Sequence, residues 1–364
     1  MKIRIMKSVL SEAVKSVQNV VPSKVNVTVL QNVLFSAKGN ELCLTTTDVE
    51  MSICTTVECE VLEEGSSTLP VKLLAPSISR MNEGKIEVET DENDVANITS
   101  GSTNFKISGI SSKLFPTLPS VDETNVYEME SQTLKEMLRK TYYAAAQDDS
   151  RRTLKGIMIE FNNQKMTVVA ADGRRLALVE KEMEVSAGME RQIVLPAKTV
   201  QELMRLINGN EKAKICVQDT QICIEIGKVK IYSKLMEEKF PNFTQVIPTN
   251  NNEIVVVDRQ MLLDSIERVS VMTMDETHSV KMVFDSNVLT VMSVVSDVGS
   301  AKDEVPIKYI GEKIEISFNP NYLMEPLKAI DDDEVRIELK DGHSPAVIKC
   351  SIPFLYVLMP LRIS

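Results

Sequence analysis

The chain carries one short pattern three times, at intervals close to the length of a small domain. An aspartate follows an apolar, strand-like run in each copy: Asp48, Asp172 and Asp297, which are 124 and 125 residues apart. A second pattern keeps the same step and opens a helical stretch at 69–72, 195–198 and 318–321. Solenoid repeats are much shorter, about 20 to 50 residues, so each copy here is long enough to bury a core of its own. The sequence therefore predicts three tandem copies of one fold.

Length and composition agree with three ordinary domains. The chain has 364 residues, of which 43% are apolar, a size and content typical of two or three globular units. Polar, proline-containing connectors at 116–125 and 248–253 predict domains at 1–124, 125–250 and 251–364. No apolar stretch is long enough to span a bilayer, and the start at Met1 lacks the apolar segment of a signal peptide. A cytoplasmic protein is expected.

The cysteines and histidines do not form a metal-binding pattern. The six cysteines, at positions 43, 54, 59, 216, 223 and 350, fall mostly in strand-like segments, and the two histidines are His278 and His343. Zinc sites and disulfide frameworks require tighter clustering of these residue types. We therefore expect free, buried thiols, no metal and no cofactor.

Each predicted repeat holds two helices within a β-rich sequence. Apolar spacing predicts helices at 7–21, 71–81, 131–145, 197–207, 259–271 and 321–330. Pro76 and Pro326 are expected to shorten or kink two of these helices. Alternating or fully apolar runs predict strands, in the order strand, helix, three strands, twice in each repeat. This order indicates an α+β fold, in which helices cover one face of antiparallel sheets.

Charge is divided unevenly between the predicted helices and the rest of the chain. The net charge of the chain is −11, which alone argues against a nucleic-acid partner. The six helices, however, carry twelve Lys or Arg and six Asp or Glu, a net of +6, which leaves −17 for strands and loops. Solvated helix faces are an ordinary explanation for such a bias. The alternative explanation is one basic surface that is built from helices.

No arrangement of residues predicts catalysis. The repeated aspartates fall in separate copies of the fold, so they are predicted to be turn residues and not an acid/base pair. The acidic run at 331–334 resembles a metal-binding cluster but occupies a helix-to-strand connection, so a solvated loop is predicted. The sequence has no glycine-rich phosphate loop and no nucleophile motif. A non-enzymatic protein is expected.

Three further segments complete a recognisable pattern. They are 171–177 (Ala-Asp-Gly-Arg-Arg-Leu-Ala), Phe240-Pro241 and 356–362 (Tyr-Val-Leu-Met-Pro-Leu-Arg). With the three β-rich repeats and the basic helices, they make the whole chain resemble the bacterial sliding clamp family, the β subunit of DNA polymerase III. The resemblance implies three clamp domains per chain and a head-to-tail homodimer closed into a ring, with helices lining the hole and sheets outside.

The resemblance also implies a function and a set of partners. A clamp of this family encircles double-stranded DNA without sequence specificity and confers processivity by tethering the replicative DNA polymerase. Its clamp loader and repair polymerases dock through short clamp-binding peptides. The charge division fits this picture, since basic helices would face the duplex while the acidic outer surface would repel it.

Three sets of site residues follow from the resemblance. The family's apolar partner-peptide pocket lies between the second and third domains, and the matching positions are Leu154, Ala171, Gly173, Arg174, Arg175, Leu176, Pro241, Val246, Val357, Met359, Pro360, Leu361 and Arg362. The DNA-facing positions are Lys24, Arg80, Lys135, Arg139, Lys198 and Arg205. The dimer interface places Val271 and Met272 against a first-domain edge strand with Phe105 and Ile107.

Some details of the pocket are specific to this chain. It departs from the family pattern at Ala171, Arg174 and Gln245. Arg175 or Arg362 is expected to meet polar groups of a partner at the rim. Tyr356 and Leu358 are predicted to belong to a core strand, not to the docking surface.

Two other functional classes remain open from the residues alone. A three-domain transferase or nuclease would need a diffuse carboxylate site, and the wide spacing of the repeated acids argues against one. A protein-interaction scaffold without nucleic acid would leave the charge of the helices unexplained. Metal-dependent nuclease activity would identify the first class, and a ring with a duplex-sized hole would identify a clamp.

Overall fold

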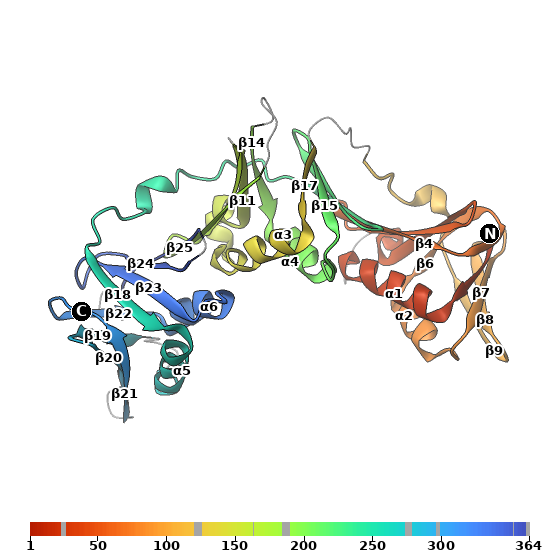
Figure 1. The fold of residues 1–364 in the computed structure, drawn as a ribbon. Coiled ribbons are helices and arrows are strands. Elements are labelled where there is room, and N and C mark those ends of the chain that lie inside the picture. The colour runs from red at the N-terminus through yellow and green to blue at the C-terminus, as the bar shows by residue number, and fades with distance from the viewer. Residues whose placement is uncertain are drawn as a thin grey trace. The chain divides into compact units, whose positions relative to one another are not determined.

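The computed structural model describes residues 1–22, 27–119, 126–162, 164–183, 190–273, 279–295, 299–351 and 353–361. Each of the three repeats runs strand, helix, three strands, strand, helix, three strands, with one additional short strand, β5, in the first (Figure 1). The predicted α+β fold class is confirmed. By its internal contacts the chain forms two compact units, Met1–Leu134 with Gln201–Leu235, and Lys135–Val200 with Met236–Ser364.

The first unit contains two antiparallel sheets. The smaller sheet has the order β5 (Glu60–Glu63), β1 (Lys2–Met6), β7 (Lys85–Thr90), β8 (Val95–Ser100), β9 (Thr103–Ser108). The larger has the order β10 (Val126–Glu130), β15 (Lys212–Val217), β16 (Gln221–Ile226), β17 (Val229–Lys234), β4 (Met51–Glu58), β3 (Glu41–Thr47), β2 (Asn32–Lys38), β6 (Gly65–Pro70). Because β17 pairs with β4, with Ile231 opposite Ile53, the larger sheet joins strands of the first and middle repeats.

Two helices cover the larger sheet of the first unit. Helix α1 (Lys7–Val17) lies on β3 and β4 and packs against α2 (Val71–Arg80) (Figure 1). Leu10 and Val14 of α1 and Leu74 and Ile78 of α2 are at most 1% exposed, so each helix buries one apolar face. The predicted helix at 7–21 is shorter than expected, since 310 helix η1 (Gln18–Val20) follows α1. Helix α2 continues through its internal proline without interruption.

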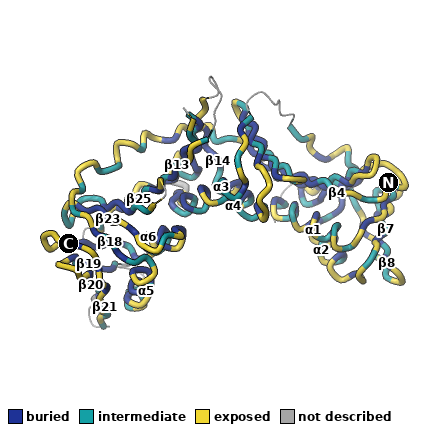
Figure 2. The backbone as a smooth tube through the Cα atoms, viewed as in Figure 1, coloured by how far each residue is buried: buried dark blue, intermediate teal, exposed yellow. Residues whose placement is uncertain are grey.

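The second unit is built on one sheet of twelve strands. Its order is β14 (Arg191–Pro196), β11 (Gly156–Asn162), β12 (Lys165–Ala171), β13 (Arg175–Glu182), β25 (Phe354–Leu358), β24 (Ala346–Lys349), β23 (Glu334–Leu339), β18 (Glu253–Asp258), β21 (Gly299–Lys308), β20 (Val288–Val295), β19 (Val280–Asp285), β22 (Ile314–Phe318). Strand β13 pairs with β25, with Leu176 opposite Val357, so this sheet joins the middle and third repeats. Buried residues follow the strands of both units (Figure 2).

Three of the four remaining helices, α4 (Ala197–Leu206), α5 (Arg259–Ser270) and α6 (Pro320–Ala329), begin and end close to the predicted positions. Helix α5 packs against α6, and α3 (Ser131–Arg139) and α4 belong to the middle repeat. The Asp258 side chain caps α5 by accepting the Met261 N–H at 2.8 Å. The predicted helix at 131–145 ends early at Arg139. The other 310 helices are η2 (Thr28–Gln31), η3 (Ser112–Leu114), η4 (Tyr142–Ala144), η5 (Asp149–Leu154) and η6 (Thr244–Val246).

The repeated aspartates form the same turn in two repeats. One carboxylate oxygen of Asp48, and one of Asp172, accepts the backbone N–H groups two and three residues further on, at 2.7–3.0 Å. The residue after each aspartate, Val49 or Gly173, has a positive φ, 79° and 82°. The prediction of turn residues is confirmed for these two copies, and Asp297 lies outside the described residues.

Candidate functional site

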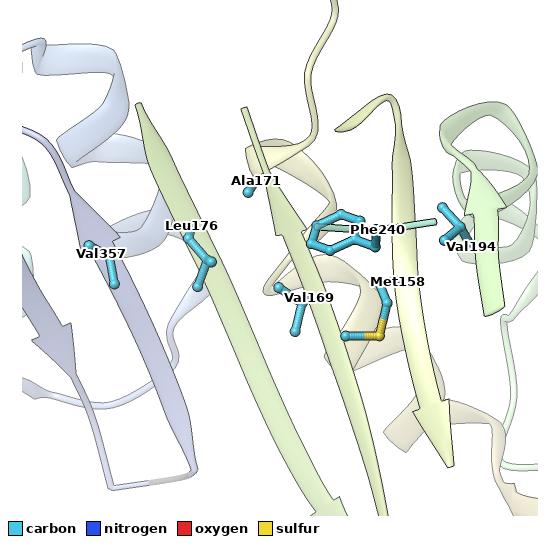
Figure 3. Packing of buried hydrophobic residues seen from close by; sticks show 7 residues of the cluster. All are labelled: Met158, Val169, Ala171, Leu176, Val194, Phe240 and Val357. Atoms are coloured by element: carbon cyan, nitrogen blue, oxygen red, sulfur yellow. The ribbon is translucent and has the colours of Figure 1, made fainter. Parts of the chain in front are cut away.

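A buried apolar cluster on the twelve-stranded sheet supports the candidate site. Side chains from five strands line up on one face, and Phe240 lies across them (Figure 3): Met158 of β11, Val169 and Ala171 of β12, Leu176 of β13, Val194 of β14 and Val357 of β25. Each is at most 8% exposed. Phe243 and Ile247 also pack against the cluster. Removal of this apolar surface from water holds the segment after β17 on the sheet.

A pocket of about 210 Å³ opens beside this cluster. Its lining comes from η5, β12, β13 and the turn before it, the segment 240–246, and β25 with the residue after it: Leu154, Ala171, Gly173, Arg174, Arg175, Leu176, Phe240, Pro241, Asn242, Phe243, Val246, Val357 and Met359. Ten of the thirteen predicted pocket residues are in this lining. Pro360 and Leu361 lie outside it, and Arg362 lies outside the described residues.

The sequence-based set omits Phe240, Asn242 and Phe243, which the structure places in the lining. The recurrence of a Phe-Pro pair at 115–116 and 240–241 is the signal that could have identified Phe240. Nothing comparable in the sequence distinguishes the other two, because they reach the pocket through the path of the loop.

Arg175 is held inside the protein and does not face the rim. Its side chain is 5% exposed, and its Nε donates to Asp172 Oδ2 at 3.0 Å. Its Nη2 donates to the Tyr143 carbonyl at 2.6 Å, and the guanidinium also pairs with Glu325 and lies 4.1 Å from the Tyr322 ring centroid. A buried charge is stable only with such partners. These contacts fix the pocket turn to α6, so Arg175 has a structural role here, and Arg362, the other residue expected to meet a partner's polar groups, lies outside the described residues.

The rim of the pocket is mostly apolar. Val246 and Met359 are 54% and 46% exposed, and Pro241 and Arg174 are also exposed. A solvent-exposed methionine beside an apolar pocket is an adaptable contact surface, because its unbranched side chain takes several shapes. Arg174 supplies positive charge at this rim.

The chain after β25 changes from core to surface within three residues. Tyr356 and Leu358 are 0% exposed, which confirms their prediction as core-strand residues. The Tyr356 hydroxyl donates to the Tyr322 carbonyl at 2.8 Å, and burial raises its pKa. The Met359 N–H then donates to the Arg174 carbonyl at 2.9 Å, which continues the pairing with β13 and holds the methionine at the pocket.

The predicted DNA-facing residues divide into two groups by environment. Arg80 at the end of α2 and Lys198 at the start of α4 are exposed, and Lys135 of α3 is half-buried. These three have side chains that extend from helices. Lys24 lies outside the described residues.

Arg205 and Arg139, the two other predicted residues, are bound to other parts of the chain. Arg205 donates to the carbonyls of Lys15 and Ser16 near the end of α1, at 3.3 and 2.7 Å. Such cationic contacts satisfy carbonyls that a helix end leaves free. Arg139 forms an ion pair with Asp331.

Lys140 also differs from a surface lysine. It is 2% exposed, and its Nζ lies 3.9 Å from Asp331 Oδ2. A buried ammonium cannot reach an external phosphate, so the net charge of +6 counted for the helices overstates the accessible positive charge. The acidic run at 331–334 is exposed at Asp331, Asp333 and Glu334, as predicted for a solvated loop, and Asp331 also forms an ion pair with Arg139 at the end of α3.

The predicted interface residues lie at strand and helix ends. Strand β9 is the last strand of its sheet, with Phe105 half-buried and Ile107 4% exposed. Val271, directly after α5, is 79% exposed, and Met272 is half-buried. Ile107 is thus mainly a core residue of its own chain. Of the four predicted interface residues, Phe105 and Val271 are the ones whose side chains are accessible, together with part of Met272.

Neither a metal cluster nor a membrane span is found among the described residues. No group of three or more His, Cys, Asp or Glu side chains in this part of the chain is arranged to hold a metal ion. Among the helices described, none combines the length and apolar character needed to cross a bilayer.

Comparison with known proteins places the chain in a family. Three consecutive family profiles match it, the N-terminal domain of the DNA polymerase III beta subunit at residues 1–119, the central domain at 128–242 and the C-terminal domain at 244–362. The beta sliding clamp of Chlamydia muridarum is 32% identical over 363 residues, which cover 100% of this chain and 99% of the relative. That of Synechococcus elongatus is 32% identical and covers 100% of both chains.

Solved structures agree with the sequence comparison. The crystal structure of a DnaN sliding clamp from Bartonella birtlesii bound to griselimycin has a TM-score of 0.95, with 29% identity and 100% coverage of both chains. Three tandem α+β domains that match in both sequence and shape define a DNA clamp. The chain belongs to the DNA polymerase III β subunit family, the bacterial sliding clamps. Its function is that of a processivity clamp in DNA replication, as the sequence predicted.

Proposed function

We propose that two copies of the chain join head to tail into a ring around duplex DNA, and that partner proteins dock in the pocket beside Met359. The domains of each copy are 1–124, 125–250 and 251–364. The chain would act in the cytoplasm, on the nucleoid, as a tether and not as a catalyst. A tether keeps the polymerase at a high local concentration near its template, and this effect raises processivity without any reaction by the clamp.

The pocket is the observation that carries the docking proposal. Its floor is made of buried Ala171, Leu176 and Val357, and its lip is made of exposed Val246 and Met359. A small apolar pocket with an adaptable lip suits the side chains of a short peptide segment. The Bartonella birtlesii relative is bound to griselimycin, so a protein of this fold does take a ligand.

The chemistry of the lining indicates what the peptide must offer. Most of the lining is apolar, so leucine-like or aromatic anchors would gain free energy by burial, at about 25 cal/mol per Å² of apolar area. Arg174 at the rim favours an acidic or polar group beside those anchors. Because few side chains contribute, a small number of contacts should dominate the affinity. The proposed partners are the replicative polymerase, the clamp loader and repair polymerases.

The DNA proposal rests on the helices. Lys15, Lys72, Arg80 and Lys198 are exposed on α1, α2 and α4. Lysine and arginine contacts to phosphates carry no sequence information, as a sliding device requires. Closure by a repeated head-to-tail contact then converts weak phosphate contacts into stable retention, since the duplex passes through a closed ring.

A polymerase assay on primed circular DNA, with the cognate polymerase and loader, tests the docking proposal. Replacing Met359 and Leu361 by serine should abolish the stimulation of processive synthesis, because the lip loses Met359 and the chain beside it loses the exposed apolar side chain of Leu361. The matched control is Ile310→Ser, which removes an apolar side chain that is 95% exposed in the same unit. The control should stimulate synthesis normally, and both variants should remain dimers in sedimentation.

Normal stimulation by the Met359 and Leu361 variant would contradict the docking site while leaving the clamp function intact. Loss of stimulation together with loss of the dimer would instead mean that the tail supports assembly. The two results are separable because sedimentation reports assembly without any partner protein.

A further inference from the structure

Two cysteines of the first unit are in direct contact. Cys43 on β3 and Cys54 on β4 are free thiols, and their Sγ atoms are 2.7 Å apart. Cys43 lies opposite Thr56 in the antiparallel register, and Cys54 lies opposite Thr45. The cysteines are therefore diagonal neighbours on one face of the eight-stranded sheet.

The two thiols differ in access and in acidity. Cys54 is 9% exposed, whereas Cys43 is half-buried and the more accessible of the two. The contact with Cys54 lowers the pKa of the Cys43 thiol below its usual range, and the same contact raises the pKa of Cys54. A thiolate is the form that attacks disulfides, so Cys43 is placed to react first and Cys54 second.

We propose that Cys43 and Cys54 form a redox-active dithiol, which closes reversibly to a disulfide by exchange with a low-molecular-weight disulfide. The Cys43 thiolate attacks one sulfur of the small disulfide, whose S–S bond breaks, and one thiolate leaves and takes up a proton. The Cys54 thiol then loses its proton and attacks Cys43 Sγ, which releases the second small thiol. Two electrons pass from the cysteine pair to the small disulfide, and two thiol products are formed.

The position of the pair favours a reversible bond. Cys43 is half-buried and not enclosed, so a small thiol can reach its sulfur and reduce the bond again. The bond would link β3 to β4, and β4 pairs with β17, where the first and middle repeats share a sheet. Lys230 of β17 lies directly opposite Cys54 in this register. Formation or loss of the disulfide would thus change a covalent link within the strands that join the first and middle repeats.

A second cysteine pair in the same sheet serves as an internal comparison. Cys216 on β15 and Cys223 on β16 are directly opposite each other, and both are buried. Burial raises the pKa of the Cys223 thiol to about 11, so it remains protonated at neutral pH. Exchange with a small disulfide should therefore select Cys43 and Cys54 over this pair.

Incubation of the reduced full-length chain in mixtures of oxidised and reduced glutathione tests the proposal. Intact mass spectrometry should show the loss of two hydrogens, and peptide mapping should show a Cys43–Cys54 link that dithiothreitol reverses. Cys54→Ser should retain one glutathione on Cys43, because no resolving thiol is present. Cys43→Ser should show neither the link nor glutathione on Cys54 over the same time. Cys59→Ser is the matched control and should form the link normally.

Mapping of the unaltered chain decides the outcome even if a variant fails to fold. A link between Cys216 and Cys223, stable glutathione on Cys43 without closure, or no loss of thiols across the glutathione range would each overturn the proposal. Circular dichroism and the melting temperature of each variant show whether it is folded, and Cys43→Ala replaces the serine variant if needed.

Discussion

The Nε atom of Arg175 donates to Oδ2 of Asp172 at 3.0 Å, and Oδ1 of the same carboxylate accepts the N–H of Arg175 at 3.0 Å. One aspartate therefore fixes both the turn that borders the pocket and the guanidinium buried behind it. In the first repeat Asp48 accepts the equivalent backbone N–H groups, but Met51 occupies the position of Arg175. The same turn is therefore present in both repeats, with the arginine in the middle repeat and without it in the first.

Replacing each aspartate by alanine should separate the contribution of the turn to the free energy of unfolding from that of the ion pair. Asp48→Ala should lower the free energy of unfolding by about 1 kcal/mol, because backbone hydrogen bonds are lost. Asp172→Ala should cost about 3 kcal/mol or more, since it also removes one of the two carboxylates that pair with the buried Arg175. Urea unfolding measures both values. Equal losses would show that the ion pair contributes nothing beyond the turn.

The residue after each aspartate provides a second comparison. Val49 has a φ of 79°, a left-handed conformation that is strained for a β-branched residue, and its side chain is 53% exposed. Val49→Gly should therefore raise the free energy of unfolding by about 0.5 to 1 kcal/mol, after the entropy cost of glycine.

The reverse change at Gly173 should destabilise the turn. A Cβ atom there would collide with the Arg151 guanidinium, in addition to the strain at a φ of 82°. Gly173→Ala should lower the urea midpoint, while Val49→Gly should raise it. A lower midpoint for Val49→Gly would mean that packing of the valine outweighs its backbone strain.

Sequence periodicity was sufficient to predict the three repeats and the positions of most helices, because both depend on the spacing of residues along the chain. Helix α2 was predicted at 71–81 and observed at Val71–Arg80. Pro76 was expected to shorten or kink it, but the helix continues through this residue to Arg80 and packs against α1. Local patterns did not predict that β17 pairs with β4, or that β13 pairs with β25. These pairings join residues far apart in the chain. Through them, some strands of the middle repeat belong to the first compact unit and others to the second.

The candidate site shows the same limit. Ten of the residues that the family resemblance implied line the pocket, but the sequence did not show that one of them, Arg175, is buried and held by carboxylates of its own chain. Lys140 was counted as accessible charge for the same reason. Both residues pair with carboxylates of the third repeat: Arg175 with Glu325, and Lys140 with Asp331.

The proposed dimer interface predicts a specific loss of assembly. Val271→Ala with Met272→Ala should shift the chain toward monomer in sedimentation, because Val271 is 79% exposed and, in the proposed ring, packs against the other copy of the chain. Met261→Ala is the matched control, since Met261 is 45% exposed on the same helix, α5. The control should leave the mass unchanged. A dimeric mass for the Val271 and Met272 variant at micromolar concentration would reject this interface.

The ring proposal predicts that retention on DNA depends on topology and only weakly on affinity. Loaded clamps should persist on closed circular DNA and leave linear DNA rapidly, because an open end lets the ring slide off. Direct binding should be weak and should fall with salt, since few phosphates are contacted at once. Arg80→Ala should weaken it further, because this side chain is exposed, whereas Arg205→Ala should act mainly on stability, because Arg205 is bound to the end of α1. Gel filtration of loaded complexes measures retention, and equal retention on linear and circular DNA would exclude sliding through a closed ring.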